Sequence, residues 1–267
     1  MGEPQTNATQ PAMLRRATTF ALLSLALPVS ALEVRVETLP SDLAAKTTSL
    51  NPDFLVLSTQ QKKNSEGKPL VIYLHGAGGR GMDIAKKKPI PRFAHSLERL
   101  ADEPAWVVAP QCLPGANEDK RIWQPNDLNI LLDHLRGLLR FEPRRVYLTG
   151  YSMGGYGSWA WGASNPEHFA AIVPVAGGLG EGGPKDITPD LDRWAKALST
   201  VPVWAWHGAD DAVVPADRSE RMIGLVRERG GSEAKLTILP GVRHDSHRTA
   251  FDDPEVVRWL LAQVKAE

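Results

Sequence analysis

The sequence contains one cysteine, Cys112, among 267 residues. A single cysteine excludes an intramolecular disulfide, so the core alone must stabilise the fold, even in an oxidising compartment. Cys112 follows the apolar run at 106–110 and lacks both a flanking glycine turn and a helix start, which favours a buried structural thiol over a nucleophile. The cysteine content therefore argues against a disulfide scaffold and against cysteine catalysis.

The chain also lacks an excess of charge, because 31 Lys and Arg residues balance 31 Asp and Glu residues. This balance argues against nucleic acid or an anionic membrane surface as a partner. The sequence has no internal repeat and no low-complexity tract, and its length suits one α/β domain with a large core. We expect this single domain to span residues 32–267.

No apolar run reaches the roughly 20 residues that a membrane-spanning helix needs. The apolar residues 20–29 follow Arg15 and Arg16 and precede the small residues Ser30 and Ala31. A basic start, a short apolar stretch and a small-residue end predict a secretory signal peptide at about residues 13–31. We therefore expect residues 1–31 to be an N-terminal extension with a signal peptide, cleavage after Ala31, and a secreted or periplasmic protein without a stable membrane anchor.

The most informative pattern present is Gly150-Tyr151-Ser152-Met153-Gly154, which directly follows an apolar run at 146–149. A strand, the pattern G-x-S-x-G and then a helix form the nucleophile elbow of α/β-hydrolases. The alternative is a serine in an ordinary glycine-rich turn. Aromatic and small side chains at helical spacing over 156–163 favour the elbow, because a helix packed under a parallel sheet has this pattern. The sequence thus predicts Ser152 as a nucleophile.

Apolar runs separated by helical patterns determine the expected fold. In parallel-sheet proteins, strands buried on both faces are almost continuously apolar, and helices cover both faces. We predict an α/β-hydrolase fold with a mostly parallel, twisted sheet of about eight strands and no large lid. The expected strands lie at 34–36, 54–57, 70–74, 106–109, 146–149, 172–175, 203–206 and 235–239, and further expected helices at 126–140, 215–229 and 254–265.

The last two predicted strands are each followed by residues that can complete a catalytic triad. Asp210 and Asp211 follow the first of them, and His244 and His247 follow the second. The order Ser, Asp, His is the order of α/β-hydrolases. Asp211 is favoured because it precedes the Val-Val-Pro that leads into a helix, whereas Asp210 is expected to cap or to face solvent. His244 lies immediately after the turn and is favoured over His247.

Histidines also raise the question of a metal site. His244 and His247 have a His-x-x-His spacing, but they lie in a loop without a clear third ligand. We expect neither a metal nor an organic cofactor. His207, at the start of the acidic loop, is expected to hold that loop by hydrogen bonds rather than to act in catalysis.

A glycine-rich loop at 76–81 allows two interpretations. It matches the G-x-G-x-x-G pattern of dinucleotide-binding folds. However, no clean helix pattern starts there, and no carboxylate for a ribose follows the next predicted strand. An oxyanion loop fits better, with the backbone N–H groups of Ala77 and Met153 receiving the developing negative charge.

Several ordered motifs together resemble the dienelactone-hydrolase-like and feruloyl-esterase-like serine esterases, often labelled predicted peptidases. The resemblance covers about residues 70–260 and implies a carboxylic ester hydrolase with the triad Ser152, Asp211 and His244. Dienelactone hydrolases proper have cysteine at the elbow, so serine here implies ester chemistry. The sequence departs from similar esterases at Arg243, where glycine is usual, and at His247, where tryptophan is usual. The matching segments are 74–81, 109–112, 147–155, 206–215 and 241–246.

The absence of a long insertion between 175 and 194 suggests an open site and favours short acyl or aryl esters, whether small molecules or esters linked to a polysaccharide. Two other functions remain possible on this scaffold, namely a peptidase with the same triad and a non-catalytic binding protein. The expected pocket residues are Trp123, Gly78, Tyr151 and His247. Trp159 or Trp161 could also line an aromatic pocket, although large residues in a helix under the sheet are more often core, and Trp204 and Trp206 are expected to pack on one face of a strand.

Overall fold

The computed structural model describes residues 1–2, 32–59, 67–84, 91–115, 122–180 and 187–266. The predicted signal peptide lies outside the described residues. No helix in the described ranges has the length and the apolar character needed to cross a membrane.

Eight strands form one sheet in the order β1-β2-β4-β3-β5-β6-β7-β8. The pairs β1–β2 and β2–β4 are antiparallel, and every other neighbouring pair is parallel. The predicted mostly parallel sheet is therefore confirmed, and all eight expected runs lie in strands. The strands are β1 (Glu33–Thr38), β2 (Leu50–Ser58), β3 (Lys68–Leu74), β4 (Trp106–Cys112), β5 (Phe141–Tyr151), β6 (Ala171–Val175), β7 (Val203–Gly208) and β8 (Ala234–Leu239).

Helices cover both faces of this sheet, as the apolar strands predict. The described α-helices are α1 (Ser41–Ala44), α3 (Arg92–Leu100), α4 (Pro125–Leu138), α5 (Met153–Ser164), α6 (Leu191–Leu198), α7 (Asp217–Glu228), α8 (His247–Asp252) and α9 (Pro254–Ala262). Short 3-10 helices lie at η1 (Ala77–Gly79) and η2 (Pro166–His168). The short helix α8 was not expected from the sequence, and the described part of the connection from β6 to α6 contains no helix.

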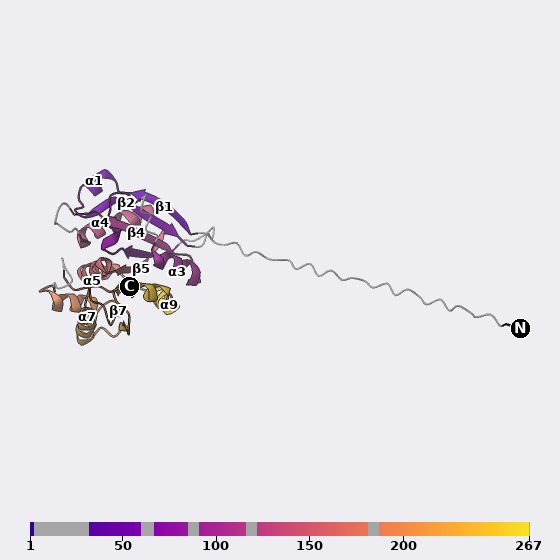
Figure 1. Ribbon diagram of the computed structural model, residues 1–267. Helices are drawn as coiled ribbons and strands as arrows, with labels where there is room; N and C mark the ends of the chain where they lie inside the picture. Colours follow the sequence, from indigo (N-terminus) through magenta and orange to yellow (C-terminus); the bar gives the residue numbers. More distant parts are fainter. Residues whose placement is uncertain (3–31, 60–66, 85–90, 116–121, 181–186, 267) are drawn as a thin grey trace.

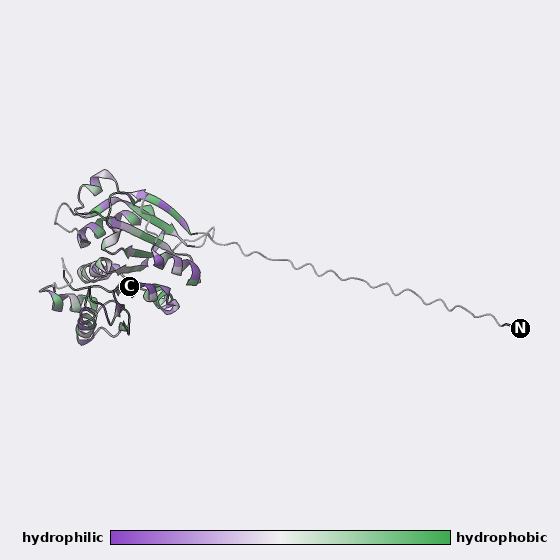
Figure 2. Ribbon diagram, in the orientation of Figure 1, coloured by the Kyte–Doolittle hydropathy of each residue, from purple (hydrophilic) through white to green (hydrophobic). Residues whose placement is uncertain are grey.

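Two hydrophobic clusters lie on opposite faces of the sheet. One packs α4, α5, α6 and α7 against the sheet, and the other packs α3, α8 and α9 against it. Figure 1 shows these two groups of helices on either side of the strands. Figure 2 shows hydrophobic residues concentrated on the strands, whereas the helices alternate between hydrophobic and hydrophilic residues. We refer below to the α5 face and the α9 face of the sheet.

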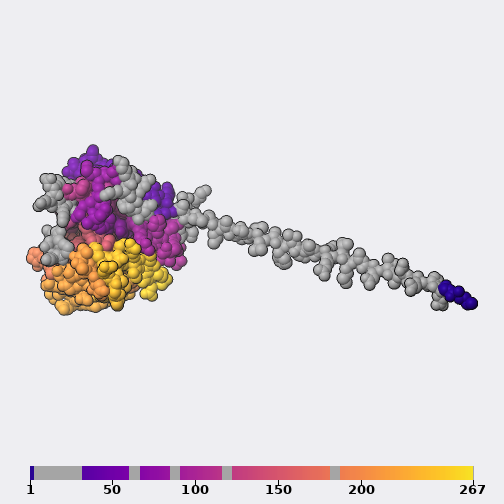
Figure 3. All heavy atoms as spheres, in the orientation of Figure 1, coloured from indigo at the N-terminus to yellow at the C-terminus, as the bar shows by residue number. Residues whose placement is uncertain are grey.

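The order of the strands separates the two halves of the chain. The early strands β1, β2 and β4 lie at one end of the sheet, and the late strands β7 and β8 lie at the other. Figure 3 shows this division as indigo and magenta atoms at one end of the molecule and orange and yellow atoms at the opposite end. Strands β3 and β5 lie between them, so the loops after these central strands face residues from both halves.

The tryptophans of α5 are core residues. Trp159 and Trp161 are both fully buried in the cluster on the α5 face, and neither lines the cavity described below. On β7, the rings of Trp204 and Trp206 lie 5.3 Å apart and pack into the cluster on the α9 face, as predicted. These large side chains stabilise the sheet rather than recognise a ligand.

Candidate active site

The predicted nucleophile elbow is present between β5 and α5. Ser152 has φ 55° and ψ −116°, a strained conformation for a residue with a Cβ, and it is the N-cap of α5. Its N–H donates to the carbonyl of Val175 at the end of β6, 2.9 Å away. The hydrogen bond to β6 on one side and the start of α5 on the other hold Ser152 in this strained conformation. The turn presents the Ser152 hydroxyl at the carboxyl edge of the sheet.

The glycines of the elbow allow the close approach that this turn needs. A Cβ added to Gly154 would lie 1.8 Å from the carbonyl oxygen of Leu74 on β3, and one added to Gly150 would lie 2.4 Å from the carbonyl oxygen of Gly154. Both contacts are far shorter than two atoms tolerate. Glycine at these positions is therefore a requirement of packing between β3, β5 and α5.

We predict that Gly154→Ala destabilises the protein by about 3 kcal/mol or more, because α5 must move away from β3. Gly224→Ala is a matched control, since Gly224 lies within α7 and an added Cβ there meets nothing within 4 Å. The control is expected to stabilise by roughly 0.5–1 kcal/mol, since alanine favours a helix. Urea unfolding measures both changes, and an unchanged midpoint for Gly154→Ala would contradict the packing argument.

Three side chains predicted from separate segments meet beside the elbow. The Oγ of Ser152 lies 2.9 Å from Nε2 of His244, and Nδ1 of His244 lies 2.7 Å from Oδ2 of Asp211. The side chain of Asp211 is fully buried, whereas that of His244 retains 22% exposure. The structure therefore brings the favoured serine, histidine and aspartate into one hydrogen-bonded row. Asp210, the alternative acid, is exposed, as expected.

The loop after β7 holds Asp211 in place. Its Oδ1 accepts the N–H groups of Val213 and Val214, each at 2.9 Å. His207 supports the same loop, because its Nε2 contacts the carbonyl of Val214 at 2.9 Å and its Nδ1 contacts the hydroxyl of Ser219 at 2.7 Å. Burial lowers the pKa of His207, which keeps this imidazole neutral. The predicted structural role of His207 is confirmed.

The predicted oxyanion donors lie at the first positions of two helices. Ala77 begins η1 and Met153 begins α5, and the first N–H groups of a helix have no partner within that helix. A Cβ on Gly76 would lie 3.5 Å from the Cβ of Ser152, so the loop that carries Ala77 adjoins the elbow. This arrangement can present two backbone donors near the serine, and the positive end of the α5 dipole adds to them.

Sequence reasoning missed His75, which connects this loop to β4. The N–H of Cys112 donates to Nε2 of His75 at 3.0 Å, so the ring proton is on Nδ1, which donates to the carbonyl of Gly76 at 2.7 Å. The Nε2 of Gln111 also donates to the carbonyl of Gly79 at 3.0 Å. The position of His75 directly after β3 was the signal in the sequence that could have indicated a functional role. Only the packed structure shows that the His75 ring reaches β4.

We predict that His75→Phe lowers the kcat of a reaction at Ser152 by roughly 100-fold, because a small displacement of the loop that carries Ala77 would misplace a predicted oxyanion donor. Phenylalanine keeps the ring but leaves the buried N–H of Cys112 without its acceptor and the carbonyl of Gly76 without its donor. His95→Phe, at an exposed position of α3, is the control and is expected to leave kcat unchanged. An unchanged kcat in a folded His75→Phe variant would exclude a role of His75 in positioning this loop.

The four predicted pocket residues separate into different environments. The centroid of the Tyr151 ring lies 5.2 Å from that of the His244 ring and 3.9 Å from that of the His247 ring, and both contacts are tilted, with interplanar angles of 42° and 35°. Burial raises the pKa of Tyr151 to about 12, with the Asp211 charge adding to the effect, and burial lowers the pKa of His247. Gly78 is exposed in η1, and an added Cβ there meets nothing within 4 Å.

Trp123 instead lines a cavity of 110 Å³ on the α5 face, together with Met153. Its Nε1 donates to the carbonyl of His75 at 3.1 Å, which places this indole between the oxyanion loop and the cavity. Gly78, Tyr151 and His247 are not among the lining residues. Of the four residues predicted to form a substrate pocket, Trp123 alone lines this cavity.

The described residues contain no group of three or more His, Cys, Asp or Glu side chains arranged to hold a metal ion. Cys112 is buried and forms no disulfide, in agreement with its predicted structural character. The structure therefore brings a serine, a histidine and an aspartate into one row, beside two helix starts that can supply backbone donors and near a cavity.

The parallel sheet, the strained elbow and the strand-end positions of the three side chains define an α/β-hydrolase. The chain belongs to the dienelactone hydrolase family, whose model matches residues 116–253. It is 28% identical over 190 residues to poly(3-hydroxyalkanoate) depolymerase C of Paucimonas lemoignei, an alignment that covers 58% of this chain and 46% of that protein. The chain thus spans less than half the length of this relative. It also covers 42% of a putative esterase of Nocardia uniformis subsp. tsuyamanensis and 44% of a 2-hydroxy-6-oxononadienedioate hydrolase of Paraburkholderia xenovorans, each 28% identical over the aligned part.

Solved structures of esterases share the fold. A thermostable esterase superposes with a TM-score of 0.67 and 24% identity, covering 88% of this chain and 63% of that one. A feruloyl esterase module from Clostridium thermocellum gives a TM-score of 0.62 at 14% identity, with 90% and 92% covered. At these identities the comparisons show the architecture, and the chemistry must be argued from the site.

Proposed function

We propose that the protein is an exported serine hydrolase that cleaves carboxylic esters through an acyl-enzyme. The observation that carries the proposal is the continuous hydrogen-bonded row from the Oγ of Ser152 through His244 to Asp211, at an elbow with φ 55°. A serine hydroxyl is a weak nucleophile unless an adjacent base removes its proton, and a third group must orient that base. Ser152, His244 and Asp211 can supply the nucleophile, the base and the orienting group.

The proposed reaction follows from this geometry. His244 accepts the proton of Ser152 as Oγ attacks the ester carbonyl, and Asp211 keeps the Nδ1 proton in place and stabilises the imidazolium. The N–H groups of Ala77 and Met153 receive the oxyanion, each worth about 3–4 kcal/mol of barrier. His244 then protonates the leaving alcohol, and water, activated by the same histidine, releases the acid and restores Ser152. The steps need no metal and no organic cofactor.

Membership of the dienelactone hydrolase family and similarity to poly(3-hydroxyalkanoate) depolymerase C favour esters over peptides. We propose short acyl or aryl esters as substrates, either as small molecules or linked to a polysaccharide. Export rests on the basic and apolar pattern at residues 13–31. A secreted or periplasmic location would give access to such substrates outside the cytoplasm.

The test is release of p-nitrophenol from acetate, butanoate and longer esters by residues 32–267, beside a peptide p-nitroanilide. We expect turnover of the esters and little or none of the anilide, because amide cleavage needs stronger assistance to the leaving group. Turnover of the anilide with no turnover of any ester would replace the esterase by a peptidase. No turnover of either substrate, with no labelling of Ser152 by a fluorophosphonate, would indicate a binding protein.

A further inference from the structure

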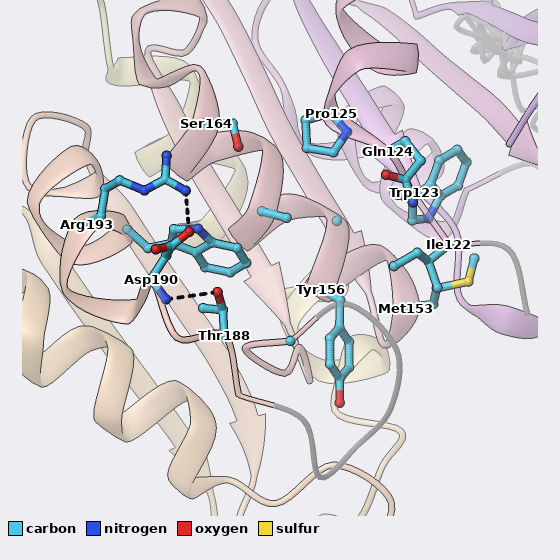
Figure 4. A pocket seen from close by; sticks show the side chains of 14 residues that line it. Ile122, Trp123, Gln124, Pro125, Met153, Tyr156, Ser164, Thr188, Asp190 and Arg193 are labelled. Atoms are coloured by element: carbon cyan, nitrogen blue, oxygen red, sulfur yellow. Dashed lines mark hydrogen bonds and ion pairs between the residues drawn. The ribbon is translucent and has the colours of Figure 1, made fainter. Parts of the chain in front are cut away.

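The cavity on the α5 face is distinct from the hydrogen-bonded row and begins next to it. Along α5 it is lined by Met153, Tyr156, Gly157, Ala160 and Ser164, which lie at helical spacing on one side of the helix. Figure 4 shows Trp123 and Ile122 on one side of this helix and Thr188, Asp190 and Arg193 on the other. Met153 immediately follows Ser152, so the cavity starts at the residue that carries a proposed oxyanion donor.

We propose that this cavity binds the acyl part of the ester, and that Ala160 sets the size of the acyl group accepted. The inference rests on the proposed function, because it concerns the group that remains on Ser152 after the alcohol has left. The cavity would take an uncharged acyl group with a short aliphatic or monocyclic body.

The position of His244 decides which part of the ester enters the cavity. His244 must protonate the leaving alcohol, so the alcohol oxygen lies at its Nε2. The His244 ring contacts the Tyr151 ring at a tilted angle, and Tyr151 packs against the cluster on the α9 face. Met153 and Trp123, which line the cavity, pack into the cluster on the α5 face. The acyl group therefore extends from Ser152 away from His244 and towards the cavity.

Dimensions limit the acyl group. A single water needs at least about 10–15 Å³ of comparable space, so 110 Å³ suits a group of roughly seven to eleven non-hydrogen atoms. Ala160 is seven residues beyond Met153 on α5, a rise of roughly 10 Å along the helix. A butanoyl or benzoyl group fits this length, whereas a long fatty chain exceeds it.

The electrostatics of the far end favour an uncharged group. Arg193 Nη2 lies 2.7 Å from Asp190 Oδ2, so the two charges compensate each other (Figure 4). The N–H of Asp190 donates to the hydroxyl oxygen of Thr188 at 3.2 Å. Because these two charges compensate each other, the far end of the cavity offers no net charge to bind an ionised acyl group, which favours a neutral one.

Ala160 is half-buried and lies on the floor of the cavity, so a larger side chain there reduces the space directly. Ala160→Leu adds three carbon atoms and is expected to slow hydrolysis of the benzoyl-enzyme by about tenfold or more while changing hydrolysis of the acetyl-enzyme by less than about twofold. Ala160→Gly is expected to change the benzoyl-to-acetyl ratio in the opposite direction. Ala197→Leu, at a half-buried position of α6 outside the cavity, is the matched control.

The experiment measures single-turnover acylation and deacylation with p-nitrophenyl acetate, butanoate and benzoate, and acetylation by acetates with different alcohols. Deacylation involves only the acyl group, so an effect in that step that grows with acyl size supports the inference. The inference would be overturned if Ala160→Leu changed the acylation rate according to the alcohol of the ester, or if it changed the deacylation rates of all acyl groups equally. If Ala160→Leu fails to fold, an unchanged ratio in Ala160→Gly overturns it as well. Failure of the wild type to form any acyl-enzyme would instead refute the proposed function.

Discussion

Ser152→Ala is expected to lower ester turnover by about 10⁴- to 10⁶-fold, because in the described part of the chain the hydroxyl of Ser152 is the nucleophile that contacts Nε2 of His244. The Oγ of Ser152 is the only atom removed, and it is the atom that lies 2.9 Å from Nε2 of His244. Alanine has the same Cβ as serine, so the strained φ of 55° costs no more in the variant than in the wild type. The fold and its stability should therefore be retained.

The measurement combines initial rates with p-nitrophenyl butanoate and mass spectrometry of the quenched enzyme. The wild type is expected to gain the mass of the acyl group, and the variant is expected to gain none. Ser232→Ala, at an exposed position before β8, is the control and should react as the wild type does. Turnover by Ser152→Ala within about tenfold of the wild type would exclude Ser152 as the nucleophile, since loss of a nucleophile costs far more than this.

Asp211→Asn is expected to lower kcat/KM by about 10⁴-fold with little change in structure. The two N–H groups of Val213 and Val214 donate to Oδ1, so in the variant the amide oxygen must take this position. The amide NH₂ then faces Nδ1 of His244, where Oδ2 accepts a hydrogen bond in the wild type. His244 would have to accept at Nδ1 and carry its proton on Nε2, and this tautomer cannot remove the proton of Ser152.

The matched control is Asp210→Asn, one residue earlier, where the side chain is exposed. It removes the same charge from the same loop and is expected to change kcat/KM by less than about twofold, as surface substitutions away from a site usually do. Proton NMR of the imidazole N–H groups of His244 adds a readout of the tautomer. Equal decreases of kcat/KM in Asp211→Asn and Asp210→Asn would show that Asp211 acts through the charge of the loop rather than through the orientation of His244.

The sequence by itself determined the elements and the chemical groups. The elbow was predictable because strand, turn and helix follow one another locally, and because glycine is required where α5 approaches β3. The preference for Asp211 over Asp210 followed from the Val-Val-Pro that comes after it, and the preference for His244 over His247 from its position immediately after the turn. Both candidate pairs come after the last two predicted strands. In parallel sheets such positions meet at one edge, so strand order alone brings the side chains together.

Only the tertiary structure decided what packs between these segments. The bond from Cys112 to the His75 ring joins the ends of β4 and β3, which are 37 residues apart, and no local pattern encodes it. The cavity is formed by the segments before α4, along α5 and at the start of α6, so its volume depends on how three helices pack. A hydrophobic pattern specifies which face of a helix is buried, but the space that remains beside that face is determined by the shapes of all its neighbours.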